Sequence, residues 1–138
     1  MCYLFESFKG WKNYCEEKQV SLVQSVVEYE IEQKNASEDK IWEGLSHAYS
    51  VMKDAVKTGL EEDMQSRSGM INNGAKRVFN HPLSVLSPDF QRLIARALAA
   101  KEVNSCMGRV VAAPTAGASG ILPGTLVTLQ EIHQLEDR

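Results

Sequence analysis

The feature that most constrains the fold of this chain is a run of small, mostly apolar residues, SCMGRVVAAPTAGASGILPG, at positions 105–124. It contains no Asp, Glu, Lys or His, and Arg109 is its one charged residue. Pro and Gly interrupt a helical pattern that is present on both sides of the run. We therefore expect a helix, a tight turn, and a second helix that starts at Pro123, because proline suits the first turn of a helix.

The turn inside this run has the chemistry of an anion site. Gly117 and Gly120 allow the backbone to come close to a ligand, and Thr115 and Ser119 add two hydroxyl groups. Free backbone N–H groups at the start of a helix favour an anion such as a carboxylate. A turn of this composition can equally be a plain connection between helices. The run matches neither a Walker A loop nor a Rossmann fingerprint.

A second turn-rich stretch, QSRSGMINNGAK, occupies residues 65–76. Asn73 and Gly74 form a strong turn pair. Arg67 and Lys76 bring positive charge to the same stretch. Taken alone, this loop is either a structural connection or a ligand contact, and its residues leave both readings open.

Composition excludes several classes of protein. The 138 residues carry a net charge of −3 and include no long basic run, which argues against binding to nucleic acid. No apolar run approaches the ~20 residues that a membrane span needs, and the N-terminus lacks the apolar core of a signal peptide. We therefore expect one cytoplasmic domain. The three cysteines, Cys2, Cys15 and Cys106, are widely spaced, which predicts free thiols and no metal site.

Helical periodicity predicts an all-α fold of about five helices, with both turn-rich loops near one end. The clearest helix repeats apolar residues every three or four positions from Ile41 to Leu60. Ser21, Ser37 and Ser87 are expected N-caps, and residues 78–85 are expected to be irregular. The expected helices cover residues 3–18, 22–33, 38–60, 88–111 and 123–136. In the fourth helix we expect Phe90, Leu93, Ile94, Ala97, Leu98 and Met107 to face inward, and in the last one Leu126, Leu129, Ile132 and Leu135 form one apolar stripe.

The run EVNSCMGRVVAAPTAGASGILPG, residues 102–124, resembles the α chain of bacterial iron–sulfur L-serine dehydratases, whose pattern is roughly EVNAAMG…AAPTAGSAG..PG. Residues 66–76 are similar to their element S-x-S-G-L/M…GG-D-A-x-[KR]. The chain departs from these patterns in two places. It has Ala118–Ser119 where many relatives read Ser-Ala. It also has Asn73 ahead of Gly74, and it has no aspartate where the family often has one. The resemblance implies substrate contacts at Ser66, Ser68 and Gly69, and carboxylate binding at Thr115, Ala116, Gly117, Ser119 and Gly120.

The resemblance also implies a reaction. L-serine loses water, and the products are pyruvate and ammonia. One iron of a 4Fe–4S cluster acts as a Lewis acid on the substrate hydroxyl, and a protein base that we cannot assign removes the α-proton. The resemblance covers only the N-terminal part of the family's α domain, and the cysteines that hold the cluster lie beyond it. We therefore expect no cluster, and no activity, in residues 1–138 alone.

The implied partners follow from this incompleteness. They are L-serine, the remaining α-domain segment with its cluster cysteines, and a β chain or β domain. Half of a larger helical catalytic domain would expose apolar surface, which makes a homodimer plausible. Two other functions stay open: a non-catalytic helical interaction module, and a related lyase that acts on another small amino acid such as cysteine.

Overall fold

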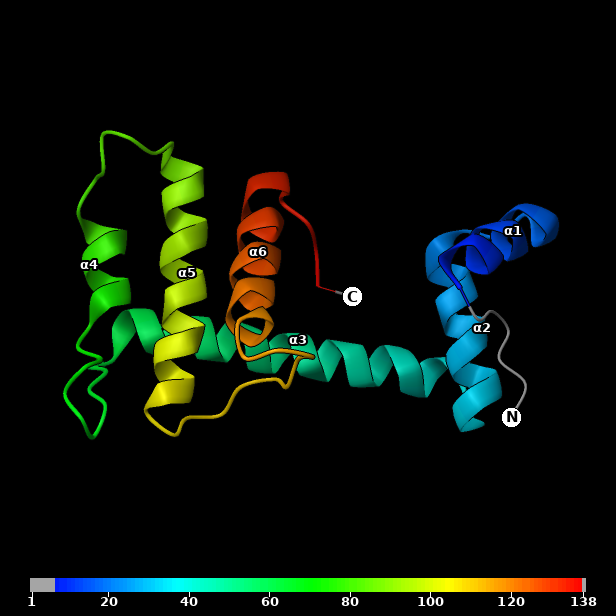
Figure 1. The fold of residues 1–138 in the computed structure, drawn as a ribbon, viewed down its shortest axis with the longest axis horizontal. Coiled ribbons are helices and arrows are strands. Elements are labelled where there is room, and N and C mark those ends of the chain that lie inside the picture. The colour runs from blue at the N-terminus through cyan, green and yellow to red at the C-terminus, as the bar shows by residue number, and fades with distance from the viewer. Residues whose placement is uncertain (1–6, 138) are drawn as a thin grey trace. The chain divides into compact units, whose positions relative to one another are not determined.

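The computed structural model describes residues 7–137. Within them the chain forms six α-helices and no β-strand longer than a single bridge. This confirms the all-α fold, with one helix more than expected. The chain forms two compact units, Met1–Leu45 and Ser46–Arg138. The helices are α1 (Phe8–Lys18), α2 (Leu22–Lys34), α3 (Glu38–Glu61), α4 (Gly74–Asn80), α5 (Pro88–Ser105) and α6 (Ala118–His133), as Figure 1 shows.

The first unit is built on a contact between α1 and α2. The Trp11 indole nitrogen donates to the hydroxyl of Ser25 at 2.7 Å, and the Tyr14 hydroxyl donates to a carboxylate oxygen of Glu28 at 2.7 Å. These two bonds fix the face that α1 presents to α2. Phe8, at the start of α1, is 74% exposed. The part of the first expected helix that precedes Ser7 lies outside the described residues.

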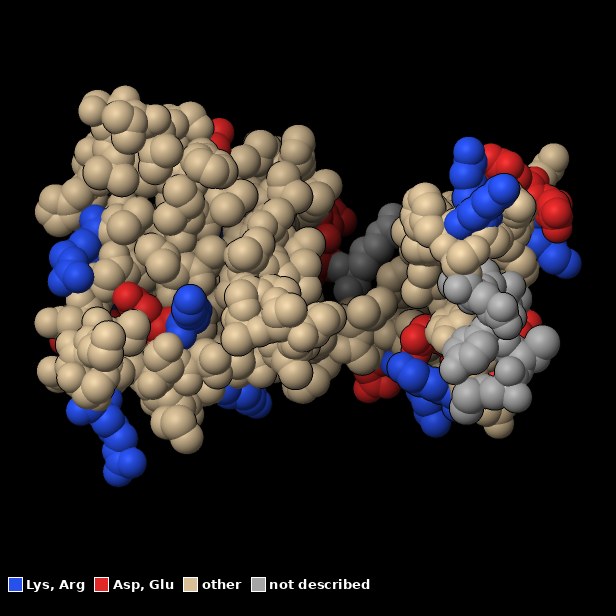
Figure 2. All heavy atoms as spheres, viewed as in Figure 1, with Lys and Arg blue, Asp and Glu red and all other residues tan. Residues whose placement is uncertain are grey.

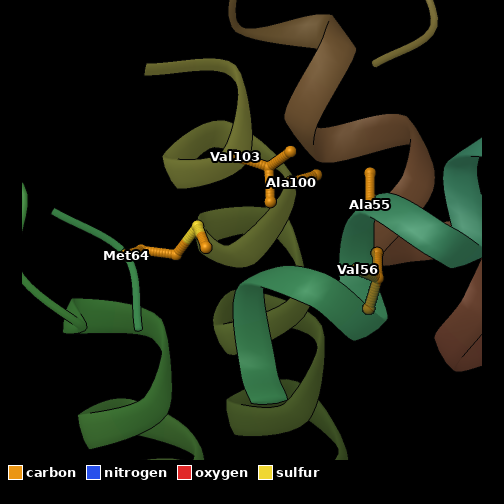
Figure 3. Packing of buried hydrophobic residues seen from close by; sticks show 5 residues of the cluster. All are labelled: Ala55, Val56, Met64, Ala100 and Val103. Carbon is orange, nitrogen blue, oxygen red and sulfur yellow. The ribbon is translucent and has the colours of Figure 1, made fainter. Parts of the chain in front are cut away.

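In the second unit α4, α5 and α6 lie side by side, with α5 between the other two (Figure 1). Its apolar core gathers small side chains of α3 and α5 around a methionine that follows α3. Figure 3 shows Met64 reaching toward α5. The buried cluster consists of Ala55, Val56, Met64, Ala100 and Val103.

The residues that α5 buries differ from the expected apolar stripe. Phe90 and Met107 were expected inside, but they are 52% and 90% exposed. The reason is that α5 is buried on a face made of alanines and of polar side chains, and these polar side chains bond to groups distant in sequence. Its buried residues are Gln91, Ala95, Arg96, Ala99, Ala100, Glu102 and Val103.

One helix end and one additional helix also differ from the sequence prediction. The fourth expected helix ends at Ser105 and not at Val111, because Met107 takes a left-handed conformation with φ +66°. The N–H of Gly108 then donates to the carbonyl of Val103 at 2.8 Å, which closes the helix end. Residues 74–80 were expected to be loop or irregular, and they form α4.

The last helix begins at Ala118, five residues before the expected start, so Pro123 lies inside it. The Thr115 hydroxyl accepts a hydrogen bond from the N–H of Ala118 at 3.1 Å, and this local cap allows the early start. The expected apolar stripe is between 38% and 58% exposed at Leu126, Leu129, Ile132 and Leu135, the last of which lies beyond the end of α6. Such a surface is consistent with a homodimer, which stays a prediction.

Candidate functional site

The two loops singled out by the sequence lie at the same end of the second unit (Figure 1). One joins α3 to α4, and the other joins α5 to α6. The first residue of α4 packs near the end of α5, because a methyl group added at Gly74 would lie 2.7 Å from Oε1 of Glu102. On α6, a methyl group added at Gly120 would lie 2.9 Å from the Ala97 carbonyl oxygen and 3.4 Å from Cβ of Lys101. The prediction that both loops share one end is confirmed.

The first loop is a small hairpin. The N–H of Ser66 donates to the carbonyl of Ile71 at 3.1 Å, and the N–H of Ile71 donates to the Ser66 hydroxyl at 3.1 Å. The hydroxyls of Ser66 and Ser68 lie 3.2 Å apart. Gly69, with φ +70°, provides the left-handed turn at the tip. Ser68 and Gly69 are exposed and Ser66 is half-buried, so the loop offers one accessible hydroxyl beside a partly covered one.

Asn73 closes the base of this hairpin. Its side-chain oxygen accepts the N–H of Met64 at 2.7 Å, and its own N–H donates to the Met64 carbonyl at 3.1 Å. Next to it, the Lys76 ammonium lies 2.9 Å from a carboxylate oxygen of Asp63. This hydrogen bond holds the pKa of Asp63 below its usual value. The Asn73–Gly74 pair, expected as a turn, is instead the left-handed N-cap and the first residue of α4, and it is held from the α3 side.

The start of α4 is capped by the side chain of Glu102 and not by that of Asn73. The Asn73 side chain makes no capping bond to α4. Instead the N–H of Ala75 donates to Oε1 of Glu102 at 3.3 Å. Glu102 is 6% exposed, and its Oε2 is buried without a hydrogen-bond partner in the described chain. In the sequence Glu102 stands out only as the first residue of the second motif. No local signal marks its contact with Ala75, because the two residues are 27 positions apart.

The second loop ends in a tight turn at the start of α6. Thr115, Ala116 and Gly117 are exposed. The Ser119 hydroxyl donates to the Ala116 carbonyl at 2.8 Å, and the Ser119 N–H donates to the Thr115 carbonyl at 3.2 Å. Within residues 7–137 the N–H groups of Ala116 and Gly117 make no hydrogen bond. The turn therefore presents two unpaired donors beside the Thr115 hydroxyl.

Gly120 differs from its neighbours in this turn. It is buried, and a methyl group added to it would lie 2.9 Å from the Ala97 carbonyl oxygen. The absence of a side chain at Gly120 therefore serves the close approach of α6 to α5. Its assignment as a substrate contact stays a prediction.

Lys and Arg side chains at this end of the unit lie beside acidic ones. Figure 2 shows separate Lys and Arg side chains where the α3–α4 and α5–α6 loops lie, with Asp or Glu atoms among them. Arg109, in the α5–α6 loop, has a side chain that is 73% exposed and lies 4.0 Å from a carboxylate oxygen of Asp54.

The described residues do not fit an iron–sulfur cluster. Among them no group of three or more His, Cys, Asp or Glu side chains is placed to hold a metal ion. Cys106 packs against the apolar cluster of the second unit, and the Cys15 thiol donates to the Ser25 hydroxyl at 3.4 Å. Cys2 lies outside the described residues. In the part of the chain that is described, no helix is both long and apolar enough to cross a bilayer.

The sequence pattern of the serine dehydratase alpha chain family matches residues 17–138. This chain belongs to that family. The chain is 30% identical over 131 residues to a protein of Bacillus subtilis (strain 168) described as "Probable L-serine dehydratase, alpha chain". It is 32% identical over 125 residues to the L-serine dehydratase alpha chain of Peptoniphilus asaccharolyticus.

These alignments cover 93% and 88% of the chain but only 43% of each relative. An L-serine dehydratase of Streptomyces coelicolor is 33% identical over 118 residues, which is 25% of its length. The chain therefore spans less than half the length of these curated relatives. No solved structure matches it.

Proposed function

We propose that this chain forms part of the substrate site of an L-serine dehydratase, which converts L-serine to pyruvate and ammonia. The observation that supports this best is that two loops, distant in sequence, lie at the same end of the second unit (Figure 1). Both loops carry the residues that resemble the dehydratase motifs. Membership in the serine dehydratase alpha chain family supports the same reaction class.

In this proposal the α5–α6 turn binds the substrate carboxylate. The unpaired N–H groups of Ala116 and Gly117 are the donors, and the Thr115 hydroxyl lies in the same turn. Backbone donors at the start of a helix suit an anion. Ser119 and Gly120 shape the turn through its local bonds and its packing on α5.

The hairpin of the α3–α4 loop supplies the other polar contacts. The exposed Ser68 hydroxyl and the adjacent Ser66 hydroxyl can donate to the substrate and accept from it. Gly69 lets the tip of the hairpin come close to a small molecule. Holding the substrate from two sides fixes the orientation of its α-carbon, which is the contribution to rate that positioning residues make. The base that removes the α-proton is not assigned to a described residue.

The family resemblance implies a 4Fe–4S cluster in the complete enzyme. Because the described residues do not fit that cluster, we place its ligands in the segment of the alpha chain that the relatives have and this chain does not span. We propose that this segment, and a β chain or β domain, complete the enzyme. The chain alone is then expected to leave L-serine unchanged.

The test uses the complete native enzyme, assembled and purified without air, with pyruvate formation from L-serine as the readout. We expect Ser68→Ala and Thr115→Val each to raise the KM for L-serine by about tenfold, the loss expected for one hydrogen bond to a charged group. Ser84→Ala is the matched control, because Ser84 is exposed in the connection between α4 and α5, at the opposite end of the helices (Figure 1).

The outcomes separate the candidate functions. Absence of pyruvate formation by the wild-type assembly would contradict the dehydratase and favour the interaction module. Faster turnover of L-cysteine than of L-serine would favour the related lyase. Unchanged KM values in both loop variants would remove the two side chains from the site.

A further inference from the structure

The two loop motifs contain one carboxylate between them. Residues 65–76 have no Asp or Glu, and residues 102–124 have Glu102 alone. Every other polar group of the proposed site is a hydroxyl, an amide or a cation. Glu102 is therefore the one anionic group that these motifs can offer to a ligand.

The surroundings of Glu102 leave one of its oxygens without a hydrogen-bond partner. The N–H of Ala75 donates to Oε1 at 3.3 Å, whereas Oε2 is buried and has no partner in the described chain. An ionised carboxylate can only accept hydrogen bonds, and a buried one is costly unless a donor, preferably cationic, satisfies it. No ion pair joins Glu102 to a described Lys or Arg: Lys76 pairs with Asp63, and Nη2 of Arg77 lies 3.9 Å from the position of a methyl group added at Gly74. The free oxygen therefore suits a cationic N–H donor.

We propose that Glu102 binds the ammonium group of the amino-acid substrate. This inference rests on the proposed function. A free amino acid carries a carboxylate and an ammonium group, and the donors of the α5–α6 turn can serve only the first. Glu102 lies near the end of α5, at the end of the unit where both loops lie (Figure 1), and Gly74 packs against its carboxylate. The substrate would then contact the α5–α6 turn through its carboxylate and Glu102 through its ammonium group.

Because Oε2 is buried, the ammonium reaches it only if a neighbouring segment moves. The segment that lies against Oε1 is the start of α4, at Gly74 and Ala75. The hydrogen bond that holds it, 3.3 Å from nitrogen to oxygen, is longer than the ~2.9 Å typical of N–H to oxygen bonds. The three N–H donors of an ammonium group can satisfy both oxygens of Glu102 when this segment shifts.

The test compares two ligands that differ in the ammonium group. L-serine is the substrate, and 3-hydroxypropionate, which is serine without its amino group, is used as a competitive inhibitor of the complete native enzyme. In Glu102→Gln we expect the KM for L-serine to rise roughly tenfold or more, because the amide keeps the size but loses the charge. The inhibition constant of 3-hydroxypropionate is expected to stay within about twofold of wild type.

Glu62→Gln is the matched control, because Glu62 is exposed at the start of the α3–α4 loop, and we expect it to change neither constant. If Glu102→Gln does not fold, Glu102→Asp keeps the charge on a shorter side chain. For Glu102→Asp we also expect a raised KM for L-serine with an unchanged inhibition constant.

Equal losses for both ligands would overturn the inference, because a purely structural cap on α4 would weaken every contact of the loop alike. Unchanged constants for both ligands would overturn it as well. A wild-type enzyme that does not convert L-serine would instead contradict the proposed function, so the two failures are distinguishable.

Discussion

Gly124 lies directly on the backbone of Ala97. A methyl group added at Gly124 would lie 2.6 Å from the Ala97 nitrogen and 2.8 Å from its Cα. Gly120, one turn earlier on α6, approaches the carbonyl of the same alanine. The crossing of α5 and α6 is therefore a contact between backbones, and it sets the position of the turn that starts α6.

Gly124→Ala is expected to lower the free energy of unfolding by about 1–3 kcal/mol, the usual cost of overpacking, because the new methyl group meets backbone atoms that cannot rotate away. The matched control is Gly44→Ala in α3, where an added methyl group meets no atom within 4 Å. That substitution should raise the free energy of unfolding by ~0.5–1 kcal/mol through helix propensity. Urea titrations followed by circular dichroism measure both. Equal midpoints for the two variants would show that α5 and α6 separate without cost.

Thr128→Val should also lower the free energy of unfolding, because it removes a buried hydrogen bond between α5 and α6. Arg96, whose side chain is 9% exposed, donates from Nη1 to the Thr128 hydroxyl at 3.1 Å and also pairs with Glu131. Valine keeps the shape of threonine but leaves that buried donor unsatisfied, which costs about 1–3 kcal/mol. The control is Thr125→Val, half-buried on the same helix, for which we expect a change within ~0.5 kcal/mol in a guanidinium titration. A Thr128→Val variant as stable as the control would mean that Arg96 finds another acceptor.

Helix starts that depend on nearby residues could be predicted from the sequence. The Ser21 hydroxyl accepts the N–H of Gln24 at 3.1 Å, and the Ser87 hydroxyl accepts the N–H of Phe90 at 3.4 Å. Both caps act across three residues, so local composition is enough to find them. The start of α4 could not be found this way, because its cap comes from Glu102 on another helix.

The buried residues of α5 could not be predicted from the sequence for a related reason. Gln91 is buried because its amide organises the connection that follows α4: it donates to the carbonyls of Val78, at 2.6 Å, and His81, at 3.0 Å, and accepts the N–H of Leu83 at 2.9 Å. An apolar-stripe argument places polar residues outside, and it fails where long-range hydrogen bonds satisfy them.

For the candidate site, motif composition predicted the two loops and their shared end. It did not predict which groups in them are already engaged. The Ser119 hydroxyl bonds to the Ala116 carbonyl, and Gly120 packs on Ala97. Such assignments depend on the packing of α6 on α5, which no spacing in the sequence expresses.

Asn73→Ala is expected to loosen the hairpin that carries Ser66 and Ser68. The alanine loses the acceptor for the Met64 N–H and must adopt φ +52°, which a side chain without a polar group rarely takes. We expect hydrogen exchange at the Met64 amide to accelerate about tenfold or more, the factor that corresponds to ~1.4 kcal/mol. Asn73→Asp keeps an oxygen acceptor and tolerates the left-handed conformation, so its exchange rate should stay near that of wild type. Equal acceleration in both variants would show that the amide group itself is dispensable.

The contact between Tyr14 and Glu28 predicts a loss of stability at high pH. The hydrogen bond to Glu28, together with partial burial, raises the pKa of Tyr14 to about 12. Because the folded pKa lies above the unfolded value of about 10, the stabilisation is complete below pH ~10 and is lost as the pH rises through 12. The tyrosinate absorbance at 295 nm, taken as wild type minus Tyr14→Phe, should therefore titrate near pH 12. Tyr14→Phe should also abolish the part of the high-pH destabilisation that comes from α1 and α2. A difference signal that titrates near pH 10 would mean that the hydrogen bond to Glu28 is not formed in solution.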